Sequence, residues 1–154
     1  MRGRTDAGNP TGARLLDAPR ALVWQAWTDP AQIVRWWGPA GFTTTIEQMD
    51  VRPGGVWKFV MHGPDGTDYA NCSVFLEVVP PERLVFEHTG GRSGAPSEHF
   101  QSRWTFEARG DRTRVVIDML FATARQRDRI ARDYGAIEGG QQTLQRLADQ
   151  LAST

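Results

Sequence analysis

Three histidines, His62, His88 and His99, carry the most versatile side-chain chemistry in this chain. Period-two patterning places His88 on the apolar side of a predicted strand together with Phe86, whereas His99 faces the opposite side of its own strand. An inward histidine can act as an acid or base near neutral pH, or it can orient a ligand carbonyl or hydroxyl group. It can also be a hydrogen-bonded residue of an inner wall, and the sequence leaves both roles open.

Metal and covalent chemistry are not expected from this sequence. The three histidines fall on different strands and faces, and no spacing typical of a zinc site is present. The single cysteine, Cys72, is expected on the inner side as a small buried hydrophobe. One cysteine allows no intramolecular disulfide, which is typical of a reducing cytosol. Because no Ser-His-acid arrangement, phosphate-binding glycine loop or nucleotide fingerprint is visible, we expect no cofactor.

The composition describes a neutral protein that is rich in aromatic rings. The 154 residues include 18 Lys and Arg against 18 Asp and Glu, and this balance disfavours nucleic acid as a partner. The chain also holds 6 Trp, 7 Phe and 2 Tyr. No signal peptide and no stretch of roughly 20 apolar residues is visible, which predicts a soluble, cytoplasmic protein without a membrane span. Residues 1–11 are expected to form a flexible tail, and residues 12–154 a single domain.

Local patterns predict the elements that must position these residues. A short strand is expected at 14–16, followed by two short helices at 19–27 and 30–37, each with a proline in its first turn. Period-two runs between 42 and 121, separated by turn signals, predict six strands. The tail from 123 is expected to be helical, and from 137 its leucines repeat at the spacing of an amphipathic helix.

Two predicted hairpins set the faces of the strands, because directly opposed residues in an antiparallel pair point the same way. A hairpin centred on residues 110–111 pairs Trp104 with Ile117 inside and Arg103 with Asp118 outside. Opposite charges then meet on the outer face, which supports this register independently of the apolar pattern.

The second hairpin, centred on residues 65–66, pairs Trp57 with Val74 and would turn Val74 inward. The strands at 83–90 and 97–108 are expected to pair His88 with Phe100. The connection at 80–82 has an odd length, which predicts a β-bulge near it. The result is a continuous antiparallel sheet with one apolar face, and the C-terminal helix is the long amphipathic element available to cover that face.

Five segments of the chain carry a resemblance to a known family: RLLDAPRALVWQAWTDP at 14–30, WWGPAGF at 36–42, RPGG at 52–55, PPERL at 80–84 and EG at 138–139. They are similar to the START-like (SRPBCC) family of homologues of the activator of the heat-shock-protein-90 ATPase, over roughly residues 14–151. The resemblance implies an α+β helix-grip fold. In that fold a curved antiparallel sheet of six to seven strands wraps around a long C-terminal helix, two short helices follow the first strand, and a cavity lies between helix and sheet.

The family comparison also shows two departures. The residues before Arg14 lack the extended character usual for the first strand, so a shortened strand is expected. Where family members often carry a bulky aromatic residue after the helix glycine, this chain has Gly140, which would leave space beside the helix.

The leading functional hypothesis is non-enzymatic binding of a small hydrophobic or amphipathic molecule between the sheet and the C-terminal helix. Small-molecule sites are typically apolar with a few polar contacts, and the inward rings and small residues fit that description. The expected ligand-binding residues are Trp37 at the cavity mouth, Trp57, Phe59, Met61, Val74, Phe86, His88, Phe100, Ser102, Trp104, Met119, Phe121, Ile137, Glu138 and Gln141.

Two other classes of function stay open at this point. The same cavity could house cyclase- or hydrolase-like acid–base chemistry through His88 and Glu138. The family name implies instead a co-chaperone that activates a heat-shock-protein-90 ATPase in a stress response, with a chaperone as partner. Fold similarity alone does not decide between these functions. A homodimer is a further expectation, drawn from family habit and the short first strand.

Overall fold

A computed structural model shows a single curved sheet that wraps around helices, and it describes residues 12–92, 98–121, 123–128 and 136–153. Its elements follow in the order β1 (Gly12–Leu16), α1 (Arg20–Thr28), α2 (Pro30–Ile33), β2 (Thr43–Met49), β3 (Val56–His62), β4 (Asp68–Val79), β5 (Arg83–Arg92), β6 (Glu98–Arg109), β7 (Arg112–Leu120) and α4 (Ala136–Ala152). No helix within these ranges combines the length and the apolar character needed to cross a membrane.

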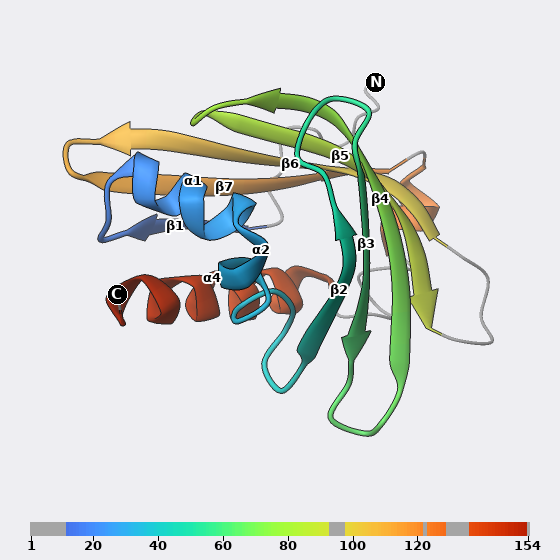
Figure 1. Ribbon diagram of the computed structural model, residues 1–154. Coiled ribbons are helices and arrows are strands. Elements are labelled where there is room, and N and C mark those ends of the chain that lie inside the picture. Colours follow the sequence, from blue (N-terminus) through green and yellow to red (C-terminus); the bar gives the residue numbers. More distant parts are fainter. Residues whose placement is uncertain (1–11, 93–97, 122, 129–135, 154) are drawn as a thin grey trace.

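The seven strands form one antiparallel sheet in the order β1-β7-β6-β5-β4-β3-β2. Figure 1 shows how β2, β3 and β4 curve away from the plane of the other strands, with α1, α2 and α4 on the concave side. Leu144 and Leu147 of α4 are fully buried against this inner face. The expected α+β helix-grip fold, with its C-terminal helix gripped by the sheet, is therefore confirmed.

The two short helices begin where the proline signals predict, but the second one is shorter than expected. Asp29 ends α1 and caps α2, because its carboxylate accepts a hydrogen bond from the backbone N–H of Ala31 at 3.0 Å. The helix itself ends at Ile33, and the residues up to Trp37 continue as turns. The Nε1–H of Trp36 donates a hydrogen bond to the carbonyl of Ala26 at 3.1 Å, which fixes the ring in this turn.

The registers of β5, β6 and β7 are those predicted from the pattern of charges and apolar residues. His88 lies opposite Phe100, and Arg103 lies opposite Asp118. The Arg103 guanidinium donates to Asp118 Oδ2 at 2.9 Å on the outer face. The expected pairing of opposite charges therefore exists in the folded chain.

The register between β3 and β4 was predicted wrongly by one residue. Trp57 lies opposite Ser73, not Val74, because the loop between the strands runs from Gly63 to Thr67 and leaves His62 opposite Asp68. A shift of one residue moves every side chain of a strand to the other face. Val74, which was expected among the ligand-binding residues, consequently faces outward. Cys72, which was expected on the inner side, faces outward as well.

The predicted bulge exists, but it lies within β4 and not at the connection to β5. Phe75 pairs with Phe86, and the next pair joins Glu77 to Val85, so that Leu76 is the extra residue. The bulge lets Phe75 and Val78 face the same side although they are three residues apart. Leu76 itself is 45% exposed.

Candidate functional site

The inner face of the sheet divides into a closely packed group of rings and a more polar region beside it. Trp27 of α1 is the centre of the ring group and is fully buried. Its ring centroid lies 5.2 Å from that of Trp57, 5.7 Å from Phe86 and 5.8 Å from Trp104. Phe59 stacks on Trp57 at 4.3 Å. Four of the expected ligand-binding residues therefore pack against one another as core.

Trp37 is the partly exposed member of this group and comes from the turn after α2. Its ring lies 4.9 Å from Trp57 and 5.5 Å from Trp104. The neighbouring Trp36 is only 1% exposed and is hydrogen-bonded to α1. Trp36 thus belongs to the core, while Trp37 packs on several rings of the group and keeps part of its own ring exposed. The expected place of Trp37 at the mouth of a cavity stays a prediction.

The segment that carries Trp37 is held by one arginine of α4. Arg146 Nη1 donates to the carbonyls of Trp37 at 3.3 Å, Gly38 at 3.0 Å and Pro39 at 3.1 Å. Its Nη2 donates to the carbonyl of Arg35 at 3.2 Å. Burial lowers the pKa of the Arg146 guanidinium from its ordinary value. We call this arrangement the Arg146 clamp, and we call residues 35–39 the Trp37 turn. The clamp fixes the position of the Trp37 turn relative to α4.

The two helix glycines noted in the sequence lie near this clamp. A Cβ atom at Gly139 would lie 3.4 Å from Pro39 Cγ, so the helix approaches the turn closely at this point. The side chain of Gln142, one turn further along, accepts a hydrogen bond from the N–H of Ala40 at 3.0 Å. A Cβ atom would still be at an ordinary contact distance, so Gly139 marks where α4 packs on the turn that carries Trp37 but is not required for that packing.

The polar region contains a row of side chains that crosses three adjacent strands. Trp57 of β3 lies opposite Ser73 of β4, Ser73 lies opposite His88 of β5, and His88 lies opposite Phe100 of β6. We call Trp57, Ser73 and His88 the polar row. Ser73 Oγ and Trp57 Nε1 are buried, and neither has a hydrogen-bond partner in the described part of the chain; the same holds for Trp27 Nε1 in the ring group. An unsatisfied buried polar group costs about 1–3 kcal/mol, so such atoms need an explanation.

His88 is held in its neutral form by its surroundings. Burial, and to a lesser extent the charge of the nearby His99, lower its pKa from the ordinary value to about 4. Its ring lies 4.7 Å from Phe100, which in turn lies 5.2 Å from Phe121. A neutral imidazole offers one hydrogen-bond donor and one acceptor to a neighbouring group.

The other expected site residues lie around the polar row or beyond it. Ser102 is buried at the inner face of β6, and Met61 and Met119 are partly buried on the same face. Gln141 is exposed on α4. The side chains of Ile137 and Glu138 lie outside the described residues, so their expected contact with a ligand stays a prediction.

Sequence reasoning missed two inner polar residues, Ser73 and Asn71. Along β4 they alternate with Cys72 and Val74. The predicted register placed Cys72 and Val74 on the inner face, whereas in the structure Asn71 and Ser73 lie there. Asn71 is 6% exposed and donates from Nδ2 to the carbonyl of Tyr69 at 2.7 Å. The fully buried Ser73 could have been found only with the correct hairpin loop.

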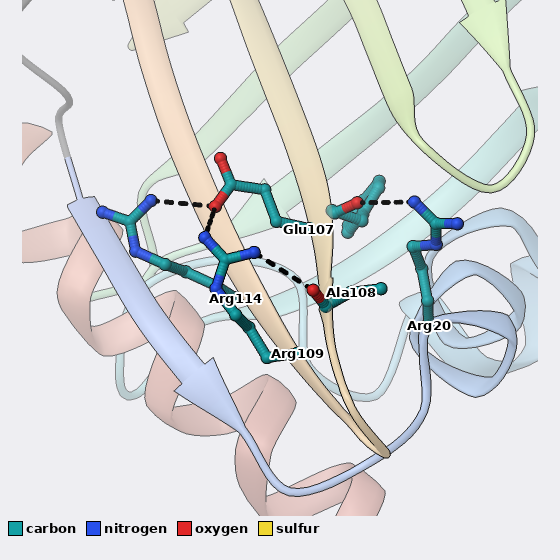
Figure 2. A network of polar contacts seen from close by, with 6 residues as sticks. Arg20, Glu107, Ala108, Arg109 and Arg114 are labelled. Atoms are coloured by element: carbon teal, nitrogen blue, oxygen red, sulfur yellow. Dashed lines mark hydrogen bonds and ion pairs between the residues drawn. The ribbon is translucent and has the colours of Figure 1, made fainter.

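The outer face carries the charged and hydrophilic networks. Glu107 accepts hydrogen bonds from Arg109 at 2.7 Å and from Arg114 at 3.2 Å, as Figure 2 shows. Arg20, also drawn there, is not one of these ion pairs, because it donates from α1 to the backbone carbonyl of Phe106 at 3.4 Å. Solvent-exposed ion pairs of this kind contribute about 0–1 kcal/mol each. They keep the charges of β6 and β7 on the side away from the polar row.

The structure also brings together a threonine, a histidine and an aspartate that the sequence did not suggest. His62 contacts Thr45 Oγ1 through Nε2 and Asp68 Oδ1 through Nδ1, both at 2.8 Å. The His62 and Asp68 side chains are 39% and 61% exposed on the outer face. This arrangement resembles a nucleophile–base–acid geometry, but water surrounds it, and we assign no chemistry to it.

A pH titration of stability tests the placement of His88. The unfolded chain takes up a proton on this residue near pH 6.5, whereas the folded chain does so only near pH 4. Between these values the unfolded state binds more protons, so stability falls as the pH falls. We expect the wild type to lose up to about 3 kcal/mol more than the His88→Gln variant between pH 6.5 and 4, measured by urea unfolding. Equal losses in both proteins would contradict the buried, neutral placement.

Several solved structures share this architecture. A solution structure of a protein from Arthrobacter aurescens matches with a TM-score of 0.84 and 29% identity, over 92% of this chain and 84% of that chain. The crystal structure of protein Ms6760 from Mycobacterium smegmatis matches with a TM-score of 0.80 and 27% identity, over 92% and 89%. Protein NE0264 from Nitrosomonas europaea matches with a TM-score of 0.79 and 26% identity, over 92% of each chain.

The family assignment follows from the sequence itself. A search among curated proteins gave no significant match. Residues 17–152 match the family model described as Activator of Hsp90 ATPase homolog 1-like protein, which includes both short helices, the strands from β2 to β7 and all of α4. The chain therefore belongs to the Activator of Hsp90 ATPase homolog 1-like family, within the START-like superfamily.

Proposed function

We propose that this protein binds a small hydrophobic or amphipathic molecule on the inner face of its sheet, between the polar row and α4. The observation that carries the proposal is that two buried polar atoms of the polar row, Ser73 Oγ and Trp57 Nε1, lack a hydrogen-bond partner and lie beside the neutral His88. Each such atom destabilises the empty protein, and a ligand that supplies a partner would remove that cost. The third unpartnered atom, Trp27 Nε1, lies within the ring group and is not part of the proposed site. The START-like fold of this family commonly binds hydrophobic ligands, which is consistent with the proposal.

The ligand would lie against the partly buried residues next to the polar row. Phe100, Phe121 and Met119 offer apolar surface there. The fully buried rings around Trp27 would form the floor of this site and hold its shape. We expect this binding to take place in the cytoplasm.

A neutral fluorescent probe, N-phenyl-1-naphthylamine, tests this function. We expect it to bind the purified protein with a gain in fluorescence, and the Phe100→Ala variant to bind it roughly tenfold more weakly, since a lost ring contact of about 1.4 kcal/mol corresponds to that factor. Phe42→Ala is the matched control, because Phe42 is also a partly buried ring with an aromatic neighbour, Tyr69 at 5.7 Å. It should leave the affinity within about twofold of the wild type.

The opposite pattern would contradict the proposal. Saturable binding that Phe42→Ala weakens and Phe100→Ala does not would move the site away from the polar row. An absence of binding to the folded wild type, together with native mass spectra that show no copurified small molecule, would overturn the ligand-binding function.

A further inference from the structure

The polar row has a chemical character that limits what it can bind. The Trp57 indole N–H can only donate a hydrogen bond, the Ser73 hydroxyl can donate or accept, and a neutral His88 offers one donor and one acceptor. Directly opposed residues of an antiparallel pair have Cβ atoms about 4.5–5.5 Å apart. Trp57 and Ser73 are therefore close enough to contact the same oxygen atom of a ligand, and His88 lies on the far side of Ser73.

The inner faces of these strands offer no charge to a ligand among the side chains that the structure describes. Among the side chains of β3, β4 and β5 that the structure describes, the charged ones fall on the other side, where Lys58 lies opposite Cys72 and Glu87 lies opposite Val74. The side chain of Arg92, whose backbone lies opposite Tyr69 at the end of β5, is outside this description. The nearby cation on α4, Arg146, already donates to four backbone carbonyls of the Trp37 turn. A carboxylate would lose its hydration here without gaining a counter-charge, which is costly in an apolar site.

We propose that the ligand is an uncharged molecule with an aromatic or otherwise apolar body and one carbonyl or hydroxyl oxygen, which the polar row receives. This inference rests on the proposed binding function and names the class of molecule bound. The ligand oxygen would accept from Trp57 Nε1 and exchange a hydrogen bond with Ser73 Oγ, so that both unpartnered atoms gain a partner. Acids of similar shape would bind more weakly, because the described side chains next to the polar row include no cation that could pair with them.

Access to the row passes the Trp37 ring. Ser73 Oγ and Trp57 Nε1 are covered in the empty protein, so a ligand reaches them only when a covering side chain moves. Trp37 is partly exposed, lies 4.9 Å from Trp57 and comes from a turn, whereas Trp57, Phe59 and Phe86 are fixed on strands. Among these rings, the partly exposed Trp37 is the one that we expect to move when a ligand enters.

Three naphthalene probes of similar size test the chemical class. They are 2-acetylnaphthalene with a carbonyl, 2-isopropylnaphthalene without an oxygen, and 2-naphthoate with a charge. Titration calorimetry or tryptophan quenching gives the affinity of the wild type for each. We expect the ketone to bind at least about tenfold more tightly than the carboxylate, because only the carboxylate must lose the water molecules that stabilise its charge. The ratio of ketone to hydrocarbon affinity should fall about fivefold to tenfold in Ser73→Ala, since one hydrogen bond is lost.

The matched control is Cys72→Ala, which alters the neighbouring residue on the outer face and should leave both ratios unchanged. Ser73→Ala removes a hydroxyl without a partner, so its thermal midpoint should equal or exceed that of the wild type. The comparison of ketone with carboxylate on the wild type decides the question even if that variant folds poorly.

The outcomes separate this inference from the function on which it rests. If the hydrocarbon binds as well as the ketone in the wild type and Ser73→Ala changes nothing, or if 2-naphthoate binds best, the inference is wrong and the binding function stands. If none of the three probes nor N-phenyl-1-naphthylamine binds, the proposed function itself is overturned.

Discussion

Replacing Trp27 with alanine is expected to lower the free energy of unfolding by about 4–5 kcal/mol, at the upper end of the range for large core residues. The side chain is fully buried, and five rings surround it, those of Trp37, Trp57, Phe75, Phe86 and Trp104. Its loss would leave a cavity between α1 and the sheet that strand residues cannot close. Domains of this size have total stabilities of about 5–15 kcal/mol, so much of the fold's margin would disappear.

Urea unfolding followed by circular dichroism measures this effect. Trp24→Ala is the matched control, because Trp24 lies on the same helix but is only partly buried and contacts one ring, Phe106, at 5.8 Å. We expect it to cost about 1–2 kcal/mol. Equal losses from the two variants would show that Trp27 is not the centre of the ring group.

Replacing Arg146 with methionine is expected to cost about 2–4 kcal/mol, since a hydrogen bond to a charged group contributes about 1.5–3 kcal/mol and several are lost together while solvent replaces part of them. Methionine keeps much of the apolar stem but removes all four bonds of the Arg146 clamp. The carbonyls of the Trp37 turn would then lack their partner on α4. Chemical unfolding gives the loss of stability, and hydrogen exchange at Gly38 and Ala40 reports the freedom of the turn.

Two further variants make the test of the clamp specific. Arg146→Lys should recover less than half of the loss, because an ammonium group cannot reach the carbonyls that a planar guanidinium spans. Arg14→Met removes a single exposed bond to Gln145 and should cost less than about 0.5 kcal/mol. If lysine restored the full stability, the positive charge, and not the several N–H donors of the guanidinium group, would hold the turn.

Much of the fold could be predicted because several local signals agreed. In β6 and β7 the apolar pattern and the outer charges selected the same register, and the structure pairs Trp104 with Ile117 accordingly. The start of α2 could be predicted because Asp29 and Pro30 supply a cap and a first helical residue. Local chemistry and tertiary packing point to the same conformation in these segments.

The register of β4 could not be predicted because its pattern is nearly symmetric. Cys72 and Val74 on one face are as apolar as Ser73 and Phe75 on the other, so hydrophobicity does not distinguish them. The decision depends on a loop from Gly63 to Thr67 in which Gly66 adopts a φ of 87°. Such a turn is compatible with the sequence but is not the single arrangement that the sequence allows.

The inward facing of several candidate residues could be predicted, but the contacts around them could not. His88, Ser102 and Phe100 could be placed inward from period-two patterning alone. The Arg146 clamp joins residues more than 100 positions apart, and no local pattern reports such a contact. The unpartnered state of Ser73 depends on every neighbour of its hydroxyl, which only the folded arrangement defines.

The extra residue in β4, Leu76, governs the chemistry of the inner wall as well as the path of the strand. Because of it, Asn71, Ser73 and Phe75 before the bulge and Val78 after it all face the interior; in a regular strand one of the two stretches would face outward. The loss of this single residue would therefore reverse one part of β4 relative to the other. A deletion can thus change the chemistry of an inner wall without any substitution among the residues that line it.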